Sequence, residues 1–574
     1  MAGGQVVKVN PKPPGAVEQL GVSIAMRDGI HLAADVFLPK NTGKWPTVLF
    51  RTPYNRKGPS GRGYRLFLQH GYAVVIQDVR GRFASQGTFR AISQEGPDGS
   101  DTIDWIAAQP WSNGQVVMAG TSYLGMVQWW AAVQDNPHLS AIAPLFSGDD
   151  EYVDRFYSTG GALKLGHRLL WLAENLTPPS GVRPLFRSYI DHVPLRSADL
   201  AATGIQLPLW RTALDHPSYD AYWKSLSIRA RVDRIRVPVL SMGGWFDNYA
   251  ESDLDMFERL AARHHAIETW IGPWGHNPFS RFPTRDFGKE ASPLFRAIQG
   301  KWFDRWTRPT AASSPQNVVP LLHIFVMGPD TWREEREWPL ARTRFTPFYL
   351  ASDGHGNSKA GDGVLLRHPV HKAHPDTFTY DPRDPVPTMG GAICCEPKIL
   401  PPGPLEQSAV ERRQDVLVYT SAPLKEPMEV TGPVRAVLFV STSANDSDFT
   451  VKLVDVQPDG RALAVCDGIQ RLRYRLSLDR PVFVKRNAAY QINVDAGVTS
   501  YVFFSGHRIR VEVSSSNYPR FDRNLNSAGP NADATKAAKA RQTVFHEKDY
   551  PSALILPIIP KRAGPAGGSE KSVP

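Results

Sequence analysis

The sequence has few cysteines: Cys394, Cys395 and Cys466 are the only three among 574 residues. Three cysteines cannot build a disulfide framework, and two adjacent cysteines bond to each other only with strain. We therefore expect a protein of the reducing cytoplasm, where thiols stay free.

Long apolar runs are also missing. No window of the chain approaches the roughly 18 consecutive apolar residues that a membrane-spanning helix needs. The N-terminal stretch MAGGQVVKVNPKPPG lacks the apolar centre of a secretory signal. We therefore expect no membrane segment and no export signal.

Concentrated charge of one sign is the third missing feature. The formal net charge is +10, but the basic residues are scattered and often stand beside acids, as in residues 333–337 (REERE). Because no basic run with interleaved aromatics occurs, nucleic acid is disfavoured as a partner. A solvated basic surface of this kind attracts anionic small molecules only weakly.

The length and the patterning predict three structural units. Residues 18–147 and 237–312 alternate short apolar strands with helical patterns, which predicts an α/β core around a parallel sheet. Residues 148–236 carry mostly helical patterns and Pro-rich loops, and we interpret them as a helical cap inserted into the core. Residues 313–560 are short alternating runs that end in turn residues, which predicts a C-terminal antiparallel sandwich or jelly roll.

The core pattern also predicts individual elements. An N-terminal hairpin is expected to turn at Asp28-Gly29, and helices are expected at 98–108 and 122–134. Both chain ends, 1–17 and 561–574, are rich in Pro, Gly and small polar residues and are expected to be disordered. The predicted core strands are 47–51, 72–77, 116–119, 140–145, 237–241 and 265–271.

Ser122 is the first candidate for chemistry. It stands in Gly120-Thr-Ser122-Tyr123-Leu-Gly125, between a predicted strand and a predicted helix. That arrangement is typical of the nucleophile elbow, a strained turn that exposes a serine hydroxyl above the sheet. The spacing is Gly-x-Ser-x-x-Gly, a slight departure from the common Gly-x-Ser-x-Gly. Serine is also a frequent helix N-cap, so a capping role is the alternative.

Two further residues stand where a serine nucleophile needs partners. The nucleophile requires a base, and the base requires an orienting acid. In this kind of fold the acid and then the histidine follow later strands. Asp247 stands just past one predicted strand and His276 just past the next. The competing acids Asp253 and Asp255 fall on the following predicted helix and are expected to be solvated.

An acyl-transfer site also needs hydrogen-bond donors for the oxyanion. The backbone N–H of Tyr123, directly after Ser122, is one candidate. The loop at 51–56 (RTPYNR) lacks the Gly-rich run that would expose a second backbone donor. The Tyr54 hydroxyl in that loop is a possible replacement, and simple packing of Tyr54 is the alternative.

These motifs occur in the order RTPYNR, DVRGRFASQG, GTSYLG, GGWFD, GPWGH and TYDPRDPVPTMGG. The ordered set resembles the cocaine esterase and X-Pro dipeptidyl-peptidase-like (CocE/NonD) family of α/β-hydrolases over roughly residues 20–555. The resemblance implies an α/β-hydrolase core with an inserted helical cap and a C-terminal jelly roll. It implies Ser122 as nucleophile, His276 as general base and acid and Asp247 as orienter, with the Tyr54 hydroxyl and the Tyr123 N–H as the oxyanion hole.

Two other motifs are weaker. The charges of residues 78–82 (DVRGR) are better explained by a salt-bridged loop that holds the site's shape than by contact with substrate. His368, His371 and His374 resemble a metal-binding motif, but their spacing on a predicted loop with an intervening proline is a weak signal. Serine chemistry needs no metal, so no metal or cofactor is expected.

Aromatic residues crowd the predicted site, which favours an apolar or aromatic acyl group. The candidate pocket residues are Trp171, Tyr249, Phe246 and Trp274. Trp129 and Trp130 point about 100° apart on their helix, so at most one of them faces any given pocket.

We therefore predict a serine carboxylesterase or acyl hydrolase that cleaves a small-molecule ester, with an amide as a further possibility. The alternative is an X-Pro dipeptidyl-peptidase, an α-amino-acid ester hydrolase or a β-lactam acylase. It requires carboxylates for a substrate ammonium, which only Asp149, Asp150 and Glu151 could partly supply. A non-catalytic binding protein is a second alternative. The oligomeric state is open, with a homodimer as one expectation.

Overall fold

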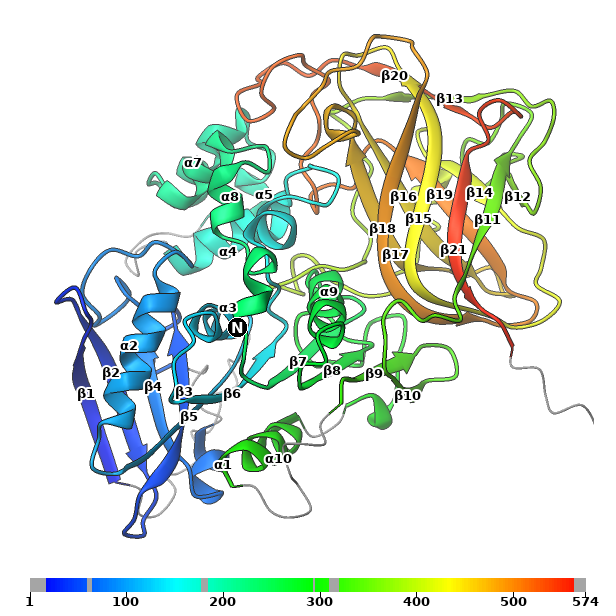
Figure 1. Cartoon of the computed structure of the whole chain (residues 1–574). Helices are drawn as coiled ribbons and strands as arrows, with labels where there is room; N and C mark the ends of the chain where they lie inside the picture. The colour runs from blue at the N-terminus through cyan, green and yellow to red at the C-terminus, as the bar shows by residue number, and fades with distance from the viewer. Residues whose placement is uncertain (1–16, 59–63, 177–183, 293–294, 309–318, 562–574) are drawn as a thin grey trace, which may run out of the picture.

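The computed structural model describes residues 17–58, 64–176, 184–292, 295–308 and 319–561. Apart from Val17 and Lys561, the chain ends that were expected to be disordered lie outside the described residues. Figure 1 shows a mixed α/β layer, a group of short helices above it and a β-rich unit beside both. None of the helices in the described part is long and apolar enough to cross a membrane.

The first unit is built on a ten-stranded sheet in the order β1-β2-β4-β3-β5-β6-β7-β8-β9-β10. Neighbours from β4 to β9 run parallel, whereas β1, β2 and β10 pair antiparallel at the two edges. Strands such as AVVIQD are buried along their whole length, as parallel strands between two helical layers must be. The strands are β1 (Val17–Ala25), β2 (His31–Leu38), β3 (Trp45–Thr52), β4 (Ala73–Asp78), β5 (Ser112–Thr121), β6 (Leu139–Leu145), β7 (Val239–Gly244), β8 (Ile267–Gly272), β9 (Leu321–Val326) and β10 (Thr331–Glu335).

Helices cover both faces of this sheet. One apolar cluster packs α2, α3 and α9 against it, and a second cluster packs α1 and α10 on the other face. Both helices and all six strands predicted for the core are therefore present, each within a few residues of its predicted bounds. The helices are α1 (Tyr64–Gln69), α2 (Glu95–Ala107), α3 (Tyr123–Ala132), α9 (Ala250–Ala261) and α10 (Phe295–Thr307).

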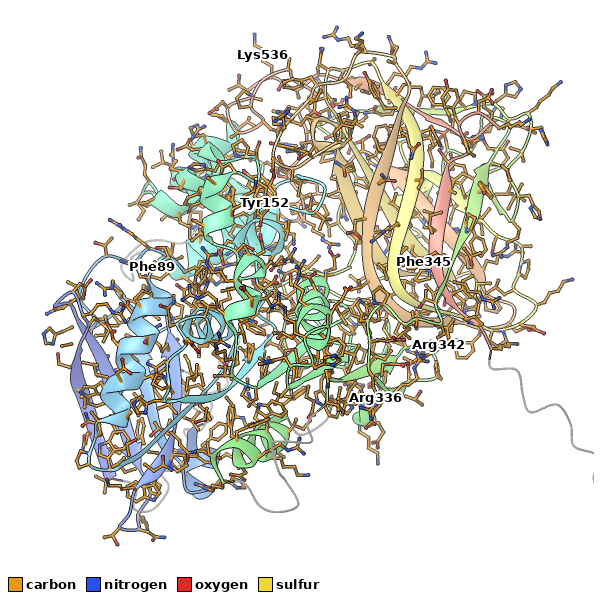
Figure 2. The ribbon with its side chains drawn as sticks, viewed as in Figure 1. Phe89, Tyr152, Arg336, Arg342, Phe345 and Lys536 are labelled. Carbon is orange, nitrogen blue, oxygen red and sulfur yellow. A yellow bond between two sulfur atoms is a disulfide. The ribbon has the colours of Figure 1, made fainter. Side chains whose placement is uncertain are left out.

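The cap lies between β6 and β7, as the sequence predicted. Aromatic rings hold it together: Tyr152 stacks on Tyr157 at 4.6 Å and also contacts Tyr219 and Trp223. Figure 2 places Tyr152 among the cap helices, above the edge of the sheet. The helical segments are a π-helix at Glu151–Phe156, α4 (Leu165–Leu176), α5 (Phe186–Tyr189), α6 (Ala198–Thr203), α7 (Pro208–Asp215), α8 (Ala221–Ser225) and 3-10 turns at Leu195–Ser197 and Arg229–Arg234.

The C-terminal unit is an eleven-stranded sheet that curls around its own apolar core. All of its strand pairs are antiparallel except the short contact between β12 and β14. The strands are β11 (Arg344–Ala351), β12 (Val364–Leu366), β13 (Asp376–Tyr380), β14 (Leu417–Thr420), β15 (Met428–Thr442), β16 (Asp448–Val456), β17 (Ala462–Arg471), β18 (Tyr490–Phe503), β19 (Arg508–Ser514), β20 (Ala540–Phe545) and β21 (Ala553–Ile559).

The predicted boundary at residue 313 is wrong for β9 and β10. Both strands belong to the first sheet, where β9 pairs in parallel with β8. The β9 sequence LLHIFV is a nearly continuous apolar run, which suits a buried parallel strand as well as a sandwich strand. Because periodicity cannot distinguish the two, the unit of curled antiparallel strands begins only at β11.

Candidate active site

Ser122 occupies a strained turn between β5 and α3. Its backbone has φ 61° and ψ −122°, outside the regions that a non-glycine residue ordinarily adopts. A Cβ on Gly120 would lie 2.3 Å from the Leu124 Cβ, and one on Gly125 would lie 2.5 Å from the Ser147 Cβ. Small residues are therefore required around the turn. The Ser122 side chain makes no capping hydrogen bond to α3, which leaves its hydroxyl free and removes the N-cap alternative.

Asp247 and His276 form a directed pair. They follow β7 and β8, and the His276 Nδ1 lies 3.0 Å from the Asp247 Oδ1. The Asp247 side chain is fully buried and that of His276 is 11 % exposed. A buried carboxylate in this position fixes the tautomer and the direction of the ring, leaving the His276 Nε2 to act on a proton.

The turn of Ser122 lies beside this pair. The Ser122 N–H donates to the carbonyl of Leu145 at 2.8 Å, at the end of β6. The next residue, Phe146, packs edge-to-face on His276 with ring centroids 6.3 Å apart. Since β5, β6, β7 and β8 are consecutive in the sheet, the three predicted residues meet at one edge, at the carboxyl ends of the strands.

The Tyr54 hydroxyl is oriented by the cap. The indole Nε1–H of Trp171, on α4, donates to the Tyr54 hydroxyl at 3.1 Å. Because the oxygen accepts this bond, the hydroxyl hydrogen is left to donate elsewhere. The loop itself is anchored below, where the Arg56 N–H and guanidinium both donate to the Asp78 carboxylate at 2.6 Å. These contacts favour the oxyanion role of Tyr54 over simple packing.

Tyr123 is held at both ends. Its N–H lies in the first turn of α3, where backbone donors have no partner within the helix. Its phenol donates to Glu95 at 2.8 Å and accepts from the Ile92 N–H at 3.1 Å. Glu95 is paired in turn with Arg51 at 2.8 Å. The side chain of Tyr123 therefore anchors the turn while its N–H remains available.

The segment at 78–82 has the structural role that the sequence favoured. Arg80 pairs with the buried Asp98, and Arg82 donates to the backbone carbonyls of Pro53 and Asn175. Arg82 thus ties the Tyr54 loop to the end of α4, which carries Trp171.

Two cap arginines that the sequence analysis missed border the site. The Arg155 guanidinium lies over the rings of Tyr123 and Trp171, at 5.6 and 5.3 Å, and that of Arg168 lies 5.4 Å from Trp171. Burial works to lower the pKa of Arg155, but the Glu151 carboxylate at 3.1 Å and the nearby tyrosines together hold that pKa above its usual value. Burial lowers the pKa of Arg168 to about 10, and the charge of Arg155 acts in the same direction. Both side chains remain cationic near neutral pH, so two positive charges lie beside the aromatic rings of the site, one of them paired with Glu151.

The predicted pocket residues divide into two pairs. Trp171 contacts Tyr54, and the Tyr249 ring lies 5.4 Å from that of His276. Trp274 and Phe246 instead contact other core residues. Trp274 donates to the Ala291 carbonyl at 2.7 Å, and Phe246 packs between two other phenylalanines. A residue that is adjacent in sequence to Asp247 or His276 does not necessarily point its side chain toward the site.

Trp129 and Trp130 both border one void of about 10 Å³ between α3 and the cap, so the expectation that at most one of them faces a given pocket is wrong. Trp129 is buried and donates its indole N–H to the Ser147 hydroxyl at 3.1 Å. Trp130 lies under the Arg231 guanidinium at 5.3 Å.

The expected solvation of Asp253 is also wrong. This residue faces the inner side of α9 and is 2 % exposed, and burial raises the pKa of its carboxyl well above the usual value. Asp255, two residues further along α9 on another face of the helix, does reach solvent and pairs with Arg229 and Arg259. Because burial favours the uncharged form of Asp253, the helix–sheet interface can hold this acid, which the helical pattern alone did not indicate.

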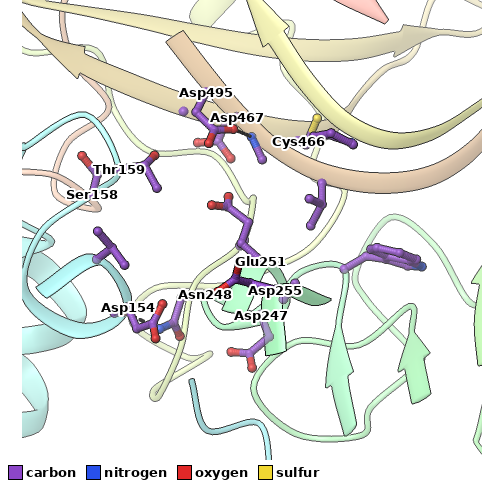
Figure 3. A pocket seen from close by; sticks show the side chains of 18 of the residues that line it. Asp154, Ser158, Thr159, Asp247, Asn248, Glu251, Asp255, Cys466, Asp467 and Asp495 are labelled. Atoms are coloured by element: carbon purple, nitrogen blue, oxygen red, sulfur yellow. Dashed lines mark hydrogen bonds between the residues drawn. The ribbon is translucent and has the colours of Figure 1, made fainter. Parts of the chain in front are cut away.

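A cavity of about 280 Å³ lies behind Asp247, where the core, the cap and the C-terminal unit meet. Its lining includes Asp247 but not Ser122 or His276. Figure 3 shows the carboxylates of Glu251, Asp467 and Asp495 lying toward one another in it, and burial raises the pKa of Glu251. This cavity is therefore a polar junction between the units rather than the place of the reacting bond.

The segment between β13 and β14 reaches the site from the C-terminal unit, and sequence reasoning missed it. The Ile393 N–H donates to the carbonyl of Phe246 at 3.2 Å. Next to it, Cys394 and Cys395 are joined as a disulfide, which the sequence analysis regarded as strained. In the described part of the chain these two sulfurs and His276 form the only three-residue group with metal-ligand proximity. His368, His371 and His374 are exposed and form no such group.

Comparison with known proteins gives the relationship of the chain. Residues 28–278 match the X-Pro dipeptidyl-peptidase (S15) family, and residues 317–555 match the X-Pro dipeptidyl-peptidase C-terminal non-catalytic domain. A cocaine esterase from Rhodococcus sp. (strain MB1 Bresler) is 39% identical over 94% of this chain and 98% of its own length.

Two solved structures extend the likeness to the fold. An aminopeptidase from the marine sediment archaeon Thaumarchaeota archaeon has a TM-score of 0.85 at 25% identity, covering 97% of this chain and 99% of its own. An α-amino acid ester hydrolase has a TM-score of 0.83 at 26% identity, covering 97% and 100%. The chain belongs to the cocaine esterase and X-Pro dipeptidyl-peptidase (S15, CocE/NonD) family, with an α/β-hydrolase core and a β-rich C-terminal domain.

Proposed function

We propose that the protein hydrolyses carboxylic esters of apolar or aromatic acyl groups through a covalent intermediate on Ser122. The observation that carries this proposal is the free serine of a strained turn beside a buried Asp247–His276 pair. The likeness to a cocaine esterase over most of both chains supports an ester as the substrate.

The chemistry needs five groups. His276 Nε2 takes the Ser122 hydroxyl proton as Oγ attacks the ester carbonyl carbon. The Tyr54 hydroxyl and the Tyr123 N–H donate to the oxyanion while Asp247 stabilises the imidazolium. The imidazolium then gives its proton to the departing alkoxide, so the alcohol leaves and the acyl group stays on Ser122. Water, deprotonated by the same imidazole, then attacks the acyl carbon; the bond to Ser122 Oγ breaks, the imidazolium returns its proton to Oγ, and the carboxylic acid leaves.

An activity on α-amino acyl groups is the second candidate, because an aminopeptidase and an α-amino acid ester hydrolase share this fold. The three acids considered as receivers of an ammonium group are already engaged. Asp149 pairs with Arg229 at 2.9 Å, Asp150 accepts from backbone N–H groups of the π-helix, and Glu151 pairs with Arg155. With Arg155 and Arg168 beside the aromatic wall, a cationic substrate group is disfavoured.

A panel of p-nitrophenyl esters tests this proposal. We expect turnover of benzoyl and short-chain acyl esters and a kcat/KM at least about tenfold lower for the matched esters with a free α-amino group, since each 1.4 kcal/mol of lost transition-state stabilisation is a factor of ten. The matching anilides separate ester from amide cleavage. Faster hydrolysis of the α-amino esters would contradict the proposed acyl preference, and no turnover of any ester would contradict the function itself.

Replacing Tyr54 by phenylalanine removes one oxyanion donor and keeps the ring. We expect kcat to fall about 10²–10³-fold with little change in KM, because the lost hydrogen bond forms in the transition state. Trp171→Phe, which removes the indole N–H that orients the hydroxyl together with part of the ring, is expected to lower kcat by less. An unchanged kcat in Tyr54→Phe, measured by steady-state hydrolysis, would remove this residue from the mechanism.

We also propose a cytoplasmic location, for which the low cysteine count is the support. A reducing compartment would favour reduction of the Cys394–Cys395 disulfide to two thiols.

A further inference from the structure

The two adjacent cysteines are held against the proposed catalytic histidine by the segment between Gly390 and Gly403. Its two ends are joined by backbone hydrogen bonds of 2.9 and 3.0 Å between Gly391 and Gly403. A Cβ on Gly275, the residue before His276, would lie 3.0 Å from Pro402 Cγ. The segment is thus seated on the loops that carry Asp247 and His276, and its position is fixed at both ends.

Three potential ligand atoms converge there. The two cysteine Sγ atoms and one ring nitrogen of His276 all lie within 4.8 Å of one another. Cys394 is 2 % exposed and Cys395 is half-buried, so the sulfurs lie in the interior of the site rather than at the surface. A tetrahedral zinc ion, with bonds of about 2.3 Å to sulfur and 2.0–2.1 Å to nitrogen, needs these ligand atoms about 3.5–3.8 Å apart. Reduction of the bridge frees the two sulfurs to separate to that spacing.

Asp247 already prepares the imidazole for this role. Its Oδ1 faces the His276 Nδ1 at 3.0 Å, so Nε2 is the nitrogen with a lone pair to offer. Histidine ligands of metal ions regularly donate their other N–H to a carboxylate, which sets the ring's direction and raises its basicity. The arrangement that suits a catalytic base therefore also suits a zinc ligand.

We propose that reduced Cys394 and Cys395, together with His276, form an inhibitory site for a thiophilic divalent cation such as Zn²⁺. A dithiol reductant converts the bridge into two thiols: it supplies two electrons and two protons and leaves as its own cyclic disulfide. On binding Zn²⁺ the two thiols release their protons to water. The oxidised pair offers no thiolate, so the state of the bridge sets the sensitivity of the enzyme to the metal.

Inhibition follows from the identity of the third ligand. An imidazole whose Nε2 lone pair is bonded to zinc cannot accept the proton of Ser122. This part rests on the proposed function, whereas metal binding does not depend on it. The Ser122→Ala protein keeps all three ligands and therefore reports on binding even where no activity exists.

Binding is measured with Zn²⁺ alone, competed against a chromophoric chelator, on protein reduced with dithiothreitol and desalted without oxygen. We expect one equivalent to bind to reduced wild type and to reduced Ser122→Ala. Loss of an outer partner of a metal ligand already costs about 10–100-fold in affinity, so the C394A/C395A protein, which lacks two ligands, should bind more than about 100-fold more weakly. Cys466→Ala is the matched control, because it removes the buried thiol outside the group and should bind as wild type does.

The same samples separate this site from the proposed function. Ester hydrolysis by reduced wild type should be lost on addition of one equivalent of Zn²⁺ and restored by a chelator, whereas diamide-oxidised wild type and C394A/C395A should show equal rates with and without the metal. Equal zinc affinity of reduced wild type and C394A/C395A or C394S/C395S would overturn the site. So would a bridge that resists dithiothreitol in the folded protein, as counted by thiol titration. Failure of Ser122 to react with a fluorophosphonate would instead overturn the proposed function and leave the zinc result standing.

Discussion

Ser122→Ala is expected to lower kcat for ester hydrolysis by about 10⁵–10⁶-fold, because removal of the attacking oxygen abolishes the covalent route. The residual rate comes from the oxyanion donors and from substrate binding. A fluorophosphonate should label the wild type and leave Ser122→Ala unlabelled, which separates loss of the nucleophile from loss of substrate binding.

The matched control is Ser93→Ala, which removes an exposed hydroxyl that donates to the Arg90 carbonyl outside the site. This protein should keep full activity and full labelling. Alanine relieves little of the φ 61° strain at position 122, so both variants should melt near the wild-type temperature. A Ser122→Ala protein that retains more than about a hundredth of wild-type kcat would refute the covalent mechanism.

Asp247→Asn is expected to lower kcat by about 10⁴-fold while the geometry stays nearly unchanged. The asparagine side chain can donate its NH₂ to the His276 Nδ1, which fixes the ring in the tautomer whose Nε2 carries a hydrogen. That nitrogen can then no longer take the proton of Ser122. Steady-state kinetics should show the whole loss in kcat and little in KM, because Asp247 makes no contact that binds the acyl group.

Asp255→Asn is the control for this substitution. Asp255 lies two turns further along, is partly exposed and pairs with Arg229 and Arg259. Its replacement removes both of these partly exposed ion pairs. Such pairs typically contribute less than about 1 kcal/mol each, so kcat should stay within about threefold. If the two substitutions lowered kcat equally, Asp247 would have no special place beside the histidine.

The sheet and the arrangement of Ser122, Asp247 and His276 could be predicted because they depend on order along the chain. Short apolar strands separated by helices leave few ways to build a parallel sheet, and residues just past such strands meet at one edge. The glycines around Ser122 indicated the tight turn directly, since the structure has no space for a Cβ at Gly120 or Gly125. These features are local, so one sequence is enough to indicate them.

The errors concern contacts between distant segments. β9 resembles a sandwich strand until β8 is known to be its parallel neighbour. Asp253 resembles a solvated helix residue until the inner face of α9 is known, and Trp274 resembles a pocket wall until Ala291 is found against its indole N–H. In each case a tertiary partner outside the segment determined the outcome, and no periodicity within the segment carries that information.

Two features of the site had no sequence signal. Arg155 and Arg168 reach the oxyanion region only through the path of the cap, and Cys394 and Cys395 reach His276 from a domain more than a hundred residues further on. The adjacent cysteines were noticed, but nothing in the chain indicated which residue they would face.

In the proposed mechanism, the hydrogen bond from Trp171 to Tyr54 links the fit of the substrate under the cap to the rate of its conversion. The cap supplies the indole, and the core supplies the phenol that it aims. A bulky molecule that displaces α4 as it enters also disturbs the orientation of the Tyr54 hydroxyl. The oxyanion is then stabilised less well in the transition state. Poor fit is thereby penalised in turnover as well as in affinity, and a change in the cap far from the reacting carbon can alter either.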